Sequence, residues 1–237
     1  MSEQNRNVQE FNTTPDENSR DHLVENIVDK NMHHFAEWKT QNPSVAFDDI
    51  PLDQLPILIP EAAYNAVENP EEVTIRKVPL GGGIHFAAIY KSENVSEEQK
   101  LADISYSRHF EHGIFKEGEH ILLMSHLFTW DKDSEVLYIN NYDGLAKAGI
   151  GKAFYTETLP KVAKQFEIRF IVGNNNDSNI EFFTDENKLG RSSLKDIKHE
   201  YREKFFPNID ANESDEKVLK NATIQFLYEE DKKIYLQ

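Results

Sequence analysis

The part of the sequence best suited to chemistry is a glycine turn that follows an apolar strand. The turn spans residues 147–152 (Lys-Ala-Gly-Ile-Gly-Lys), and the strand before it carries the apolar run 136–139. A strand that leads through a glycine turn into a helix gathers free backbone N–H groups and the positive end of the helix dipole at one point. Such a point binds anions, and a pyrophosphate group suits it well. The sequence therefore predicts an anion site at this turn.

The elements around the turn must hold it in place. We expect a strand over 135–140 before it, a helix over 150–166 after it that Pro160 interrupts, and a short buried strand over 168–172. A helical crossover makes the two strands parallel, and we expect them to splay apart near Asn140. The polar turn 131–134 joins residues 120–130 to the first of these strands as an antiparallel hairpin.

The remaining pattern completes a mixed sheet. The predicted class is α/β in the broad sense (α+β): a mixed, mostly antiparallel open sheet flanked by helices, with an N-terminal helical extension. We divide the chain into a polar tail (1–19), the helical extension (20–70) and the main domain (71–237). The other expected elements are helices over 21–40, 61–67, 97–106 and 193–205, a helix from about residue 178, a hairpin of 73–78 and 84–90 joined by Gly81–Gly83, and a closing strand pair of 222–228 and 233–236.

The bulk composition excludes several classes of function. The 237 residues include no cysteine, which rules out disulfides, thiolate catalysis and cysteine metal sites. The net charge is −16 and no basic face is evident, so we expect no nucleic-acid partner. No apolar run approaches the roughly 20 residues that span a bilayer, and the polar start has no secretory pattern, so we expect no membrane association and a cytoplasmic protein. An acidic surface can attract a cationic amine, although it more often only maintains solubility.

Together, these features resemble the GNAT superfamily of acyl-CoA-dependent N-acyltransferases. The family pattern is Gln/Arg-x-x-Gly-x-Gly/Ala after the fourth strand, followed by a helix, a fifth strand and an Asn-x-x-Ala-x-x-Phe-Tyr helix. The chain has Ala146 to Gly151 at the first motif and Asn176 to Phe183 at the second. The resemblance implies transfer of an acetyl group from acetyl-CoA, or a related acyl-CoA, to a primary amine of a small molecule or protein by direct attack in a ternary complex.

The resemblance also implies a set of cofactor-binding residues. The end of the strand would hydrogen-bond the pantetheine arm, and Asn176 would hold the splay between the strands or touch the cofactor. The implied pantetheine residues are Ile139, Asn140 and Asn141. The implied pyrophosphate residues are Lys147, Ala148, Gly149, Ile150, Gly151 and Lys152.

Two side chains are the candidates for acid–base catalysis. Glu135 opens the strand before the turn, where histone-type family members carry a base carboxylate that deprotonates the amine. The alternative for Glu135 is a solvated turn residue beside Asp131 and Asp133. Tyr142 is the candidate acid, because the family tyrosine is replaced by Phe183, which cannot protonate a thiolate.

These departures leave two other hypotheses open. The missing Gln/Arg at Ala146 and the missing tyrosine fit a catalytically inactive GNAT-like binding or regulatory module, because fold does not determine function. An acidic interaction protein is the third possibility, although negative residues spread through every element argue against it. His109 and His112 are expected to be ordinary histidines and not metal ligands. The sequence specifies neither the acceptor nor an oligomeric state, and we expect the N-terminal extension to determine specificity.

Overall fold

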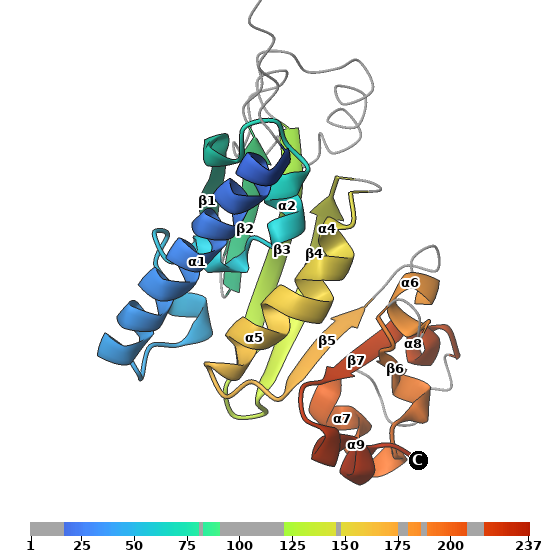
Figure 1. Ribbon diagram of the computed structural model, residues 1–237. Helices are drawn as coiled ribbons and strands as arrows, with labels where there is room; N and C mark the ends of the chain where they lie inside the picture. Colours follow the sequence, from blue (N-terminus) through green and yellow to red (C-terminus); the bar gives the residue numbers. More distant parts are fainter. Residues whose placement is uncertain are drawn as a thin grey trace, which may run out of the picture.

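The computed structural model describes residues 17–80, 83–90, 121–145, 148–174, 180–185, 189–207 and 216–237. These residues form a seven-stranded sheet in the order β1-β2-β3-β4-β5-β7-β6, flanked by helices (Figure 1). Among the described pairs, β4 and β5 are parallel and the rest are antiparallel. The predicted α+β class with a mostly antiparallel open sheet is confirmed. The strands are β1 Val73–Leu80, β2 Gly83–Tyr90, β3 Ile121–Asp131, β4 Val136–Gly144, β5 Phe170–Asn174, β6 Ser192–Ser193 and β7 Ala222–Phe226.

Both predicted hairpins form. β1 pairs with β2 from Val73↔Tyr90 to Leu80↔Gly83, and β3 pairs with β4 across the turn after Asp131. β4 runs to Gly144, further than predicted, so Tyr142 lies inside the strand and not beyond its end. The helix predicted over 97–106 and the pair His109 and His112 lie outside the described residues.

The parallel crossover between β4 and β5 is one continuous helical segment. It consists of α4 Ile150–Ala153, a π-helical segment η5 Phe154–Thr158 and α5 Leu159–Lys164. Pro160 lacks an N–H, and its ring crowds the carbonyl four residues earlier, so the helix widens to a π geometry just before it. The interruption predicted at Pro160 is therefore present as a π-helical segment.

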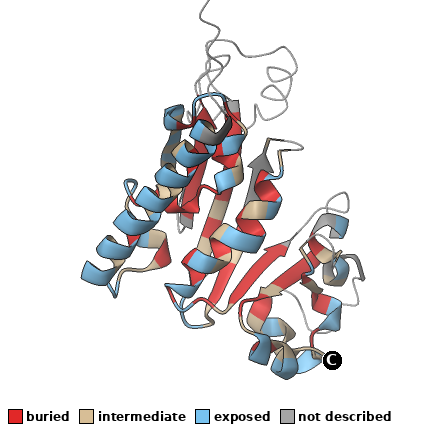
Figure 2. Ribbon diagram, in the orientation of Figure 1, coloured by how far each residue is buried: buried red, intermediate tan, exposed pale blue. Residues whose placement is uncertain are grey.

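The N-terminal part packs on the same face of the sheet as the crossover helix. It contains α1 Glu17–Gln41 and α2 Glu61–Asn65, with short 3-10 helices η1 Phe47–Asp49, η2 Leu55–Leu58 and η3 Pro70–Glu72. Val24 and Phe35 anchor α1 in a large apolar cluster that also holds Phe154 and Leu159. Figure 2 shows the resulting pattern, with buried strands and helices exposed along their outer sides.

The sheet separates two apolar clusters. Leu137 and Ile171 belong to the cluster under α1 and the crossover helix, whereas Val136 and Phe170 belong to a second cluster with Phe205. Because successive strand residues point to opposite faces, β4 and β5 contribute to both clusters. Among the described residues, no helix combines the length and apolarity needed to cross a bilayer.

The C-terminal quarter differs from the sequence-based expectation in two places. The single helix predicted over 193–205 is wrong: the segment splits into β6, η6 Leu194–Asp196, η7 His199–Tyr201 and α7 Arg202–Phe205. Ser193 and Asp196 form a reciprocal capping box that stops the strand and starts a 3-10 turn.

The strand predicted over 233–236 is also wrong, because Glu229–Tyr235 is the helix α9. Three acidic residues in its first turn complement the helix dipole and favour helix over strand. β7 pairs with β5 and β6 instead of with this segment. Two further helices, α6 Ile180–Thr184 and α8 Glu216–Asn221, complete the C-terminal part.

Candidate functional site

The glycine turn leads into the crossover helix as predicted. Gly149 is the N-cap of α4 with φ of 71°, a left-handed conformation that glycine adopts without steric cost. A Cβ built on Gly149 would meet nothing within 4 Å, so the space in front of the helix end is open. Glycine has no side chain to cap the first N–H groups of the helix, and no side chain in the described part of the chain caps them. This end of the helix therefore fits an anionic group.

Two lysines were expected to add charge at the turn. Lys152 is exposed in the first turn of the helix, so its ammonium group is accessible to solvent. Lys147 lies outside the described residues. Gly151 is buried, so a large substitution there would disturb packing as well as any ligand.

β4 has a bulge at the residue where the sequence predicts a splay. Leu127 pairs with Asn141 and Phe128 pairs with Ile139, which makes Asn140 the extra residue of the bulge. A bulge takes peptide groups out of the regular ladder and leaves them for other partners. The parallel ladder between β4 and β5 ends at Ile139↔Gly173, although β4 continues to Gly144. The two strands thus stop pairing next to the bulge, as expected.

The bulge lies in the middle of β4, and the glycine turn follows the C-terminal end of the same strand. β4 runs from the bulge through Asn141 and Tyr142 to Gly144, and a short connection leads to Gly149 (Figure 1). Tyr142 pairs with His126 of β3. Ala148, Ile150 and Gly151 follow in the turn and first helical turn, and Asn176 lies outside the described residues.

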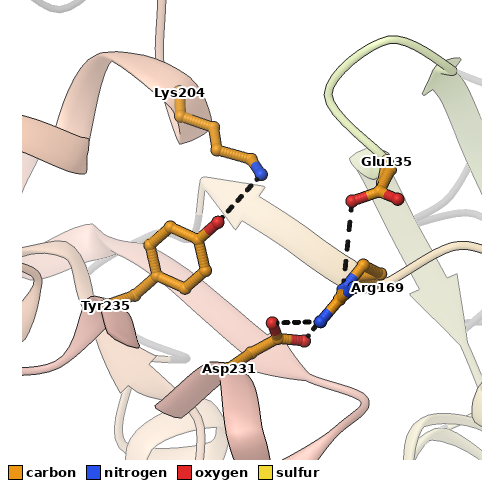
Figure 3. Close-up of polar contacts among 5 residues, drawn as sticks. All are labelled: Glu135, Arg169, Lys204, Asp231 and Tyr235. Carbon is orange, nitrogen blue, oxygen red and sulfur yellow. Dashed lines mark hydrogen bonds and ion pairs between the residues drawn. The ribbon is translucent and has the colours of Figure 1, made fainter. Parts of the chain in front are cut away.

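Glu135 lies at the opposite end of β4. It sits in the turn with φ of 58°, its side chain is 43% exposed, and its carboxylate is 3.9 Å from Nε of Arg169. Figure 3 shows this carboxylate directed toward Arg169, which also binds Asp231. Five strand residues at about 3.3 Å each put Glu135 about 17 Å from the bulge. The structure does not bring Glu135 together with the glycine turn.

The contacts of Arg169 explain the position of Glu135. Arg169 donates to both carboxylate oxygens of the buried Asp231, at 2.6 and 3.2 Å. These bonds, with the charges of Asp231 and Glu135, raise the pKa of Arg169. Beside this pair, Lys204 donates to the hydroxyl of Tyr235 (Figure 3). The group holds α9 and the β4 turn against the start of β5.

A buried polar cluster that sequence reasoning missed lies on the helix-covered face of the sheet. His126 of β3 stacks on Phe154 at 4.1 Å between ring centroids, and Tyr155 meets it edge-on at 5.7 Å. The guanidinium of Arg191 lies 4.6 Å from the Tyr155 ring and 5.1 Å from the Phe183 ring. No local sequence signal distinguishes Arg191 from a surface arginine, because its burial depends on elements distant in sequence.

The charges of this cluster are positive or neutral. Burial lowers the pKa of His126 well below its usual value, and the charges of Arg191 and His85 lower it further. Burial also lowers the pKa of Arg191 to about 10, so Arg191 stays charged at neutral pH. Phe183, where the GNAT pattern has a tyrosine, is buried against Tyr155 and Arg191 and not open to solvent.

A separate groove of about 130 Å³ opens between the N-terminal extension and the crossover helix. Met32 and Phe35 of α1 and Ile57 of η2 form one side, and Thr158 and Val162 line the other. These helix residues lie two or more turns beyond Gly149, so the groove is distinct from the anion site.

We also searched for metal-binding side chains and for similar proteins. Within the described ranges, no group of three or more His, Asp or Glu side chains is arranged to hold a metal ion. Comparisons of the chain with protein-family models, with curated proteins and with solved structures find no match.

Proposed function

We propose that the chain binds acyl-CoA thioesters and transfers the acyl group, acetyl in the simplest case, to a primary amine. The observation that carries this proposal is the bulge at Asn140, where the β4–β5 ladder ends on the strand that leads to the helix start at Gly149. A thioester needs two kinds of contact, N–H donors for its pyrophosphate and free peptide groups along its pantetheine arm. We assign the first to the helix start at Gly149 and the second to β4 from the bulge onward.

The pyrophosphate is assigned to the helix start. The first N–H groups of the continuous helix 150–164 point out of its N-terminus, the helix dipole favours negative charge there, and Lys152 adds a mobile cation. The local field matters because the chain as a whole carries a net charge of −16, which repels an anionic ligand.

The pantetheine arm is assigned to the bulged strand. Ile139, Asn140 and Asn141 provide peptide groups at the point where β5 no longer pairs with β4. An amide-containing arm placed there would continue the ladder that the two strands leave open. Peptide N–H groups at the bulge would also polarise the thioester carbonyl.

The transfer itself needs little from side chains. A neutral amine attacks the carbonyl carbon and the C–N bond forms. The nitrogen then releases one proton to solvent, the C–S bond breaks, and CoA leaves as a thiolate that takes up one proton. Holding both reactants in line makes the attack effectively unimolecular, which removes a large part of the activation barrier. Tyr142 follows the bulge on the same strand and is the candidate donor to the thiolate.

We assign Glu135 to the turn and not to the reaction. A general base must reach the proton that it abstracts within hydrogen-bonding distance or through one water molecule. An exposed carboxylate about 17 Å along the strand from the bulge does not meet this condition. We therefore propose that the amine loses its proton to solvent.

A transfer assay with a mass-spectrometric readout tests this proposal. Purified protein is incubated with acetyl-CoA and a panel of primary amines, and the release of free CoA thiol is measured together with acetylated amine. We expect turnover with at least one amine, reduced by Tyr142→Phe and rising with pH toward the amine's own pKa.

The second candidate is a CoA-binding module without turnover. The absent family tyrosine at Phe183 and the burial of that position favour it. Binding of acetyl-CoA without release of thiol, across the amine panel and from pH 6 to 9, would select this candidate over the enzyme. An amine partner follows only from the transferase proposal, whereas we propose a cytoplasmic location for either candidate.

A further inference from the structure

Arg191 is buried without a negative partner in the described part of the chain. Its side chain is 4% exposed, and one of its terminal nitrogens donates to Oε1 of Gln225 at 3.1 Å. Its Nε has no hydrogen-bond partner among the described residues, and no ion pair joins it to a carboxylate whose position the structure describes. Burying an unpaired charge is costly, and the two rings that flank Arg191 offset only part of that cost.

The contrast with Arg169 makes this arrangement unusual within the same protein. Arg169 is more exposed, with a side chain at 35%, yet it has both oxygens of Asp231 and a second carboxylate nearby. Arginine's planar guanidinium binds carboxylates in a two-pronged geometry, so it is the usual choice where a carboxylate must be recognised. Arg191 has the same chemistry and no such group among the described residues.

The place of Arg191 in the fold points to the ligand. Gln225, which accepts its hydrogen bond, lies on β7 opposite Ile171 of β5, and it also donates to the backbone carbonyl of Tyr155 at 3.0 Å. Two residues beyond Ile171 on β5 is Gly173, the last partner of β4. Arg191 is thus held between the crossover helix and the sheet, near the end of the β4–β5 ladder.

We propose that Arg191 receives a carboxylate at the end of the acyl group, so that the preferred donor is the CoA thioester of a short dicarboxylic acid. This inference rests on the proposed function, because it places the thioester at the bulge of β4. The acyl chain would pass from the bulge toward the helix-covered face, where a single negative charge would neutralise the cluster of Arg191 and the neutral His126.

Isothermal titration with matched acyl-CoA pairs tests the inference on the full chain. Malonyl-, succinyl- and glutaryl-CoA are compared with the neutral thioesters of equal carbon number, namely propionyl-, butyryl- and valeryl-CoA, and with CoA alone. We expect at least one dicarboxylic thioester to bind at least about tenfold more tightly than its neutral partner, as a charged hydrogen-bonded pair would give. The acyl-chain length that gives the tightest binding indicates the distance from the thioester at the bulge to the Arg191 guanidinium.

Three variants assign the effect to the side chain. Arg191→Gln should abolish the preference while leaving the affinity for CoA alone unchanged, and Arg191→Lys should keep part of it. Arg202→Gln is the matched control, because the Arg202 guanidinium donates to backbone carbonyls of Ile197 and Lys195, away from the bulge. Thermal unfolding checks that each variant folds. If Arg191→Gln does not fold, the wild-type titrations alone still show whether the protein prefers dicarboxylic thioesters.

The outcomes separate the two proposals. Binding of CoA with no preference for any dicarboxylic thioester overturns the inference and leaves the proposed function standing. A preference that survives in Arg191→Gln overturns the assignment to Arg191. An absence of binding by CoA and all thioesters at millimolar concentration overturns the proposed function, and this inference with it.

Discussion

At the scale of single residues, His126 links protonation to stability. Its pKa in the folded protein is well below the ordinary value of 6.5, because the ring is buried and positive neighbours oppose a second charge. The unfolded chain therefore binds a proton more readily than the folded chain below pH 6.5. This part of the stability is complete above that pH and is lost as the pH falls.

Replacing His126 by phenylalanine should make the protein less sensitive to acid. Between pH 7 and pH 5 the wild type should lose up to about 2 kcal/mol more unfolding free energy than His126→Phe, because each pH unit below 6.5 corresponds to at most about 1.4 kcal/mol for one proton. Urea unfolding at several pH values measures the difference. Identical pH slopes for the two proteins would show that His126 does not titrate between the folded and unfolded states as described.

The two carboxylates at Arg169 should differ sharply in their effect on stability. Asp231 is buried and doubly bonded to Arg169, so Asp231→Asn should lower the unfolding free energy by about 2–3 kcal/mol. Glu135 is half exposed and 3.9 Å away, so Glu135→Gln should change it by less than about 0.5 kcal/mol.

Denaturant unfolding of Asp231→Asn and Glu135→Gln measures the two changes in unfolding free energy. A transfer assay of Glu135→Gln tests separately whether the carboxylate takes part in the reaction. We expect the transfer rate of Glu135→Gln to equal that of the wild type. A loss of 10²-fold or more at neutral pH would instead restore the carboxylate as the general base that the sequence suggested.

At the scale of elements, the end of α5 contains a strained residue. Glu167 follows the helix with φ of 60°, a conformation usually occupied by glycine after a helix C-terminus. Its side chain is exposed. Glu167→Gly should therefore raise the unfolding free energy by about 0.5–1 kcal/mol, because relief of the strain exceeds the entropic cost of glycine.

Glu157→Gly is the matched control for this change. Glu157 is also exposed but lies inside the continuous helix, where glycine should destabilise by about 1 kcal/mol. Thermal and urea unfolding compare the two variants. A destabilised Glu167→Gly protein would mean that the left-handed conformation at Glu167 carries no strain.

Elements with a strong local signal could be predicted from the sequence, and those set by distant contacts could not. The hairpins follow from apolar alternation, and the turn at Gly149 follows from a glycine run between a strand and a helix. The segment after Ser193 alternates charge and suggests one helix, whereas its capping box and burial against the second cluster break it into short pieces. α9 was misread because its apolar residues are few, while its acidic first turn carries the stronger signal.

The candidate site divides in the same way. The sequence predicts a splay near Asn140 and a helix after the glycine turn, and the bulge at Asn140 and the helix cap at Gly149 lie at these positions. The buried cluster of His126 and Arg191 joins β3 to a loop more than sixty residues away, and no sequence pattern marks it. The distance of Glu135 from the turn could have been anticipated, because a strand is long and its two ends are far apart.

At the scale of the whole molecule, one sheet carries two apolar clusters and a single end at which strands, helix and turn converge. The N-terminal extension and the crossover helix cover one face, and α7 and α9 cover part of the other (Figure 1). The β4–β5 ladder ends at the bulge of β4, on the strand that leads to the helix start at Gly149. With a net charge of −16, binding of an anion must come from that local geometry.

Titration of acetyl-CoA into the wild type, Lys152→Glu and Lys161→Glu tests the central claim most directly. Lys152 is exposed at the start of the crossover helix, whereas Lys161 is exposed further along it, in α5, so both variants make the same charge change on one element. We predict a dissociation constant on the order of 10 µM for the wild type and for Lys161→Glu, and binding at least about tenfold weaker for Lys152→Glu. Equal affinities for all three proteins, or no heat of binding at millimolar acetyl-CoA, would contradict the assignment of the thioester to this helix end.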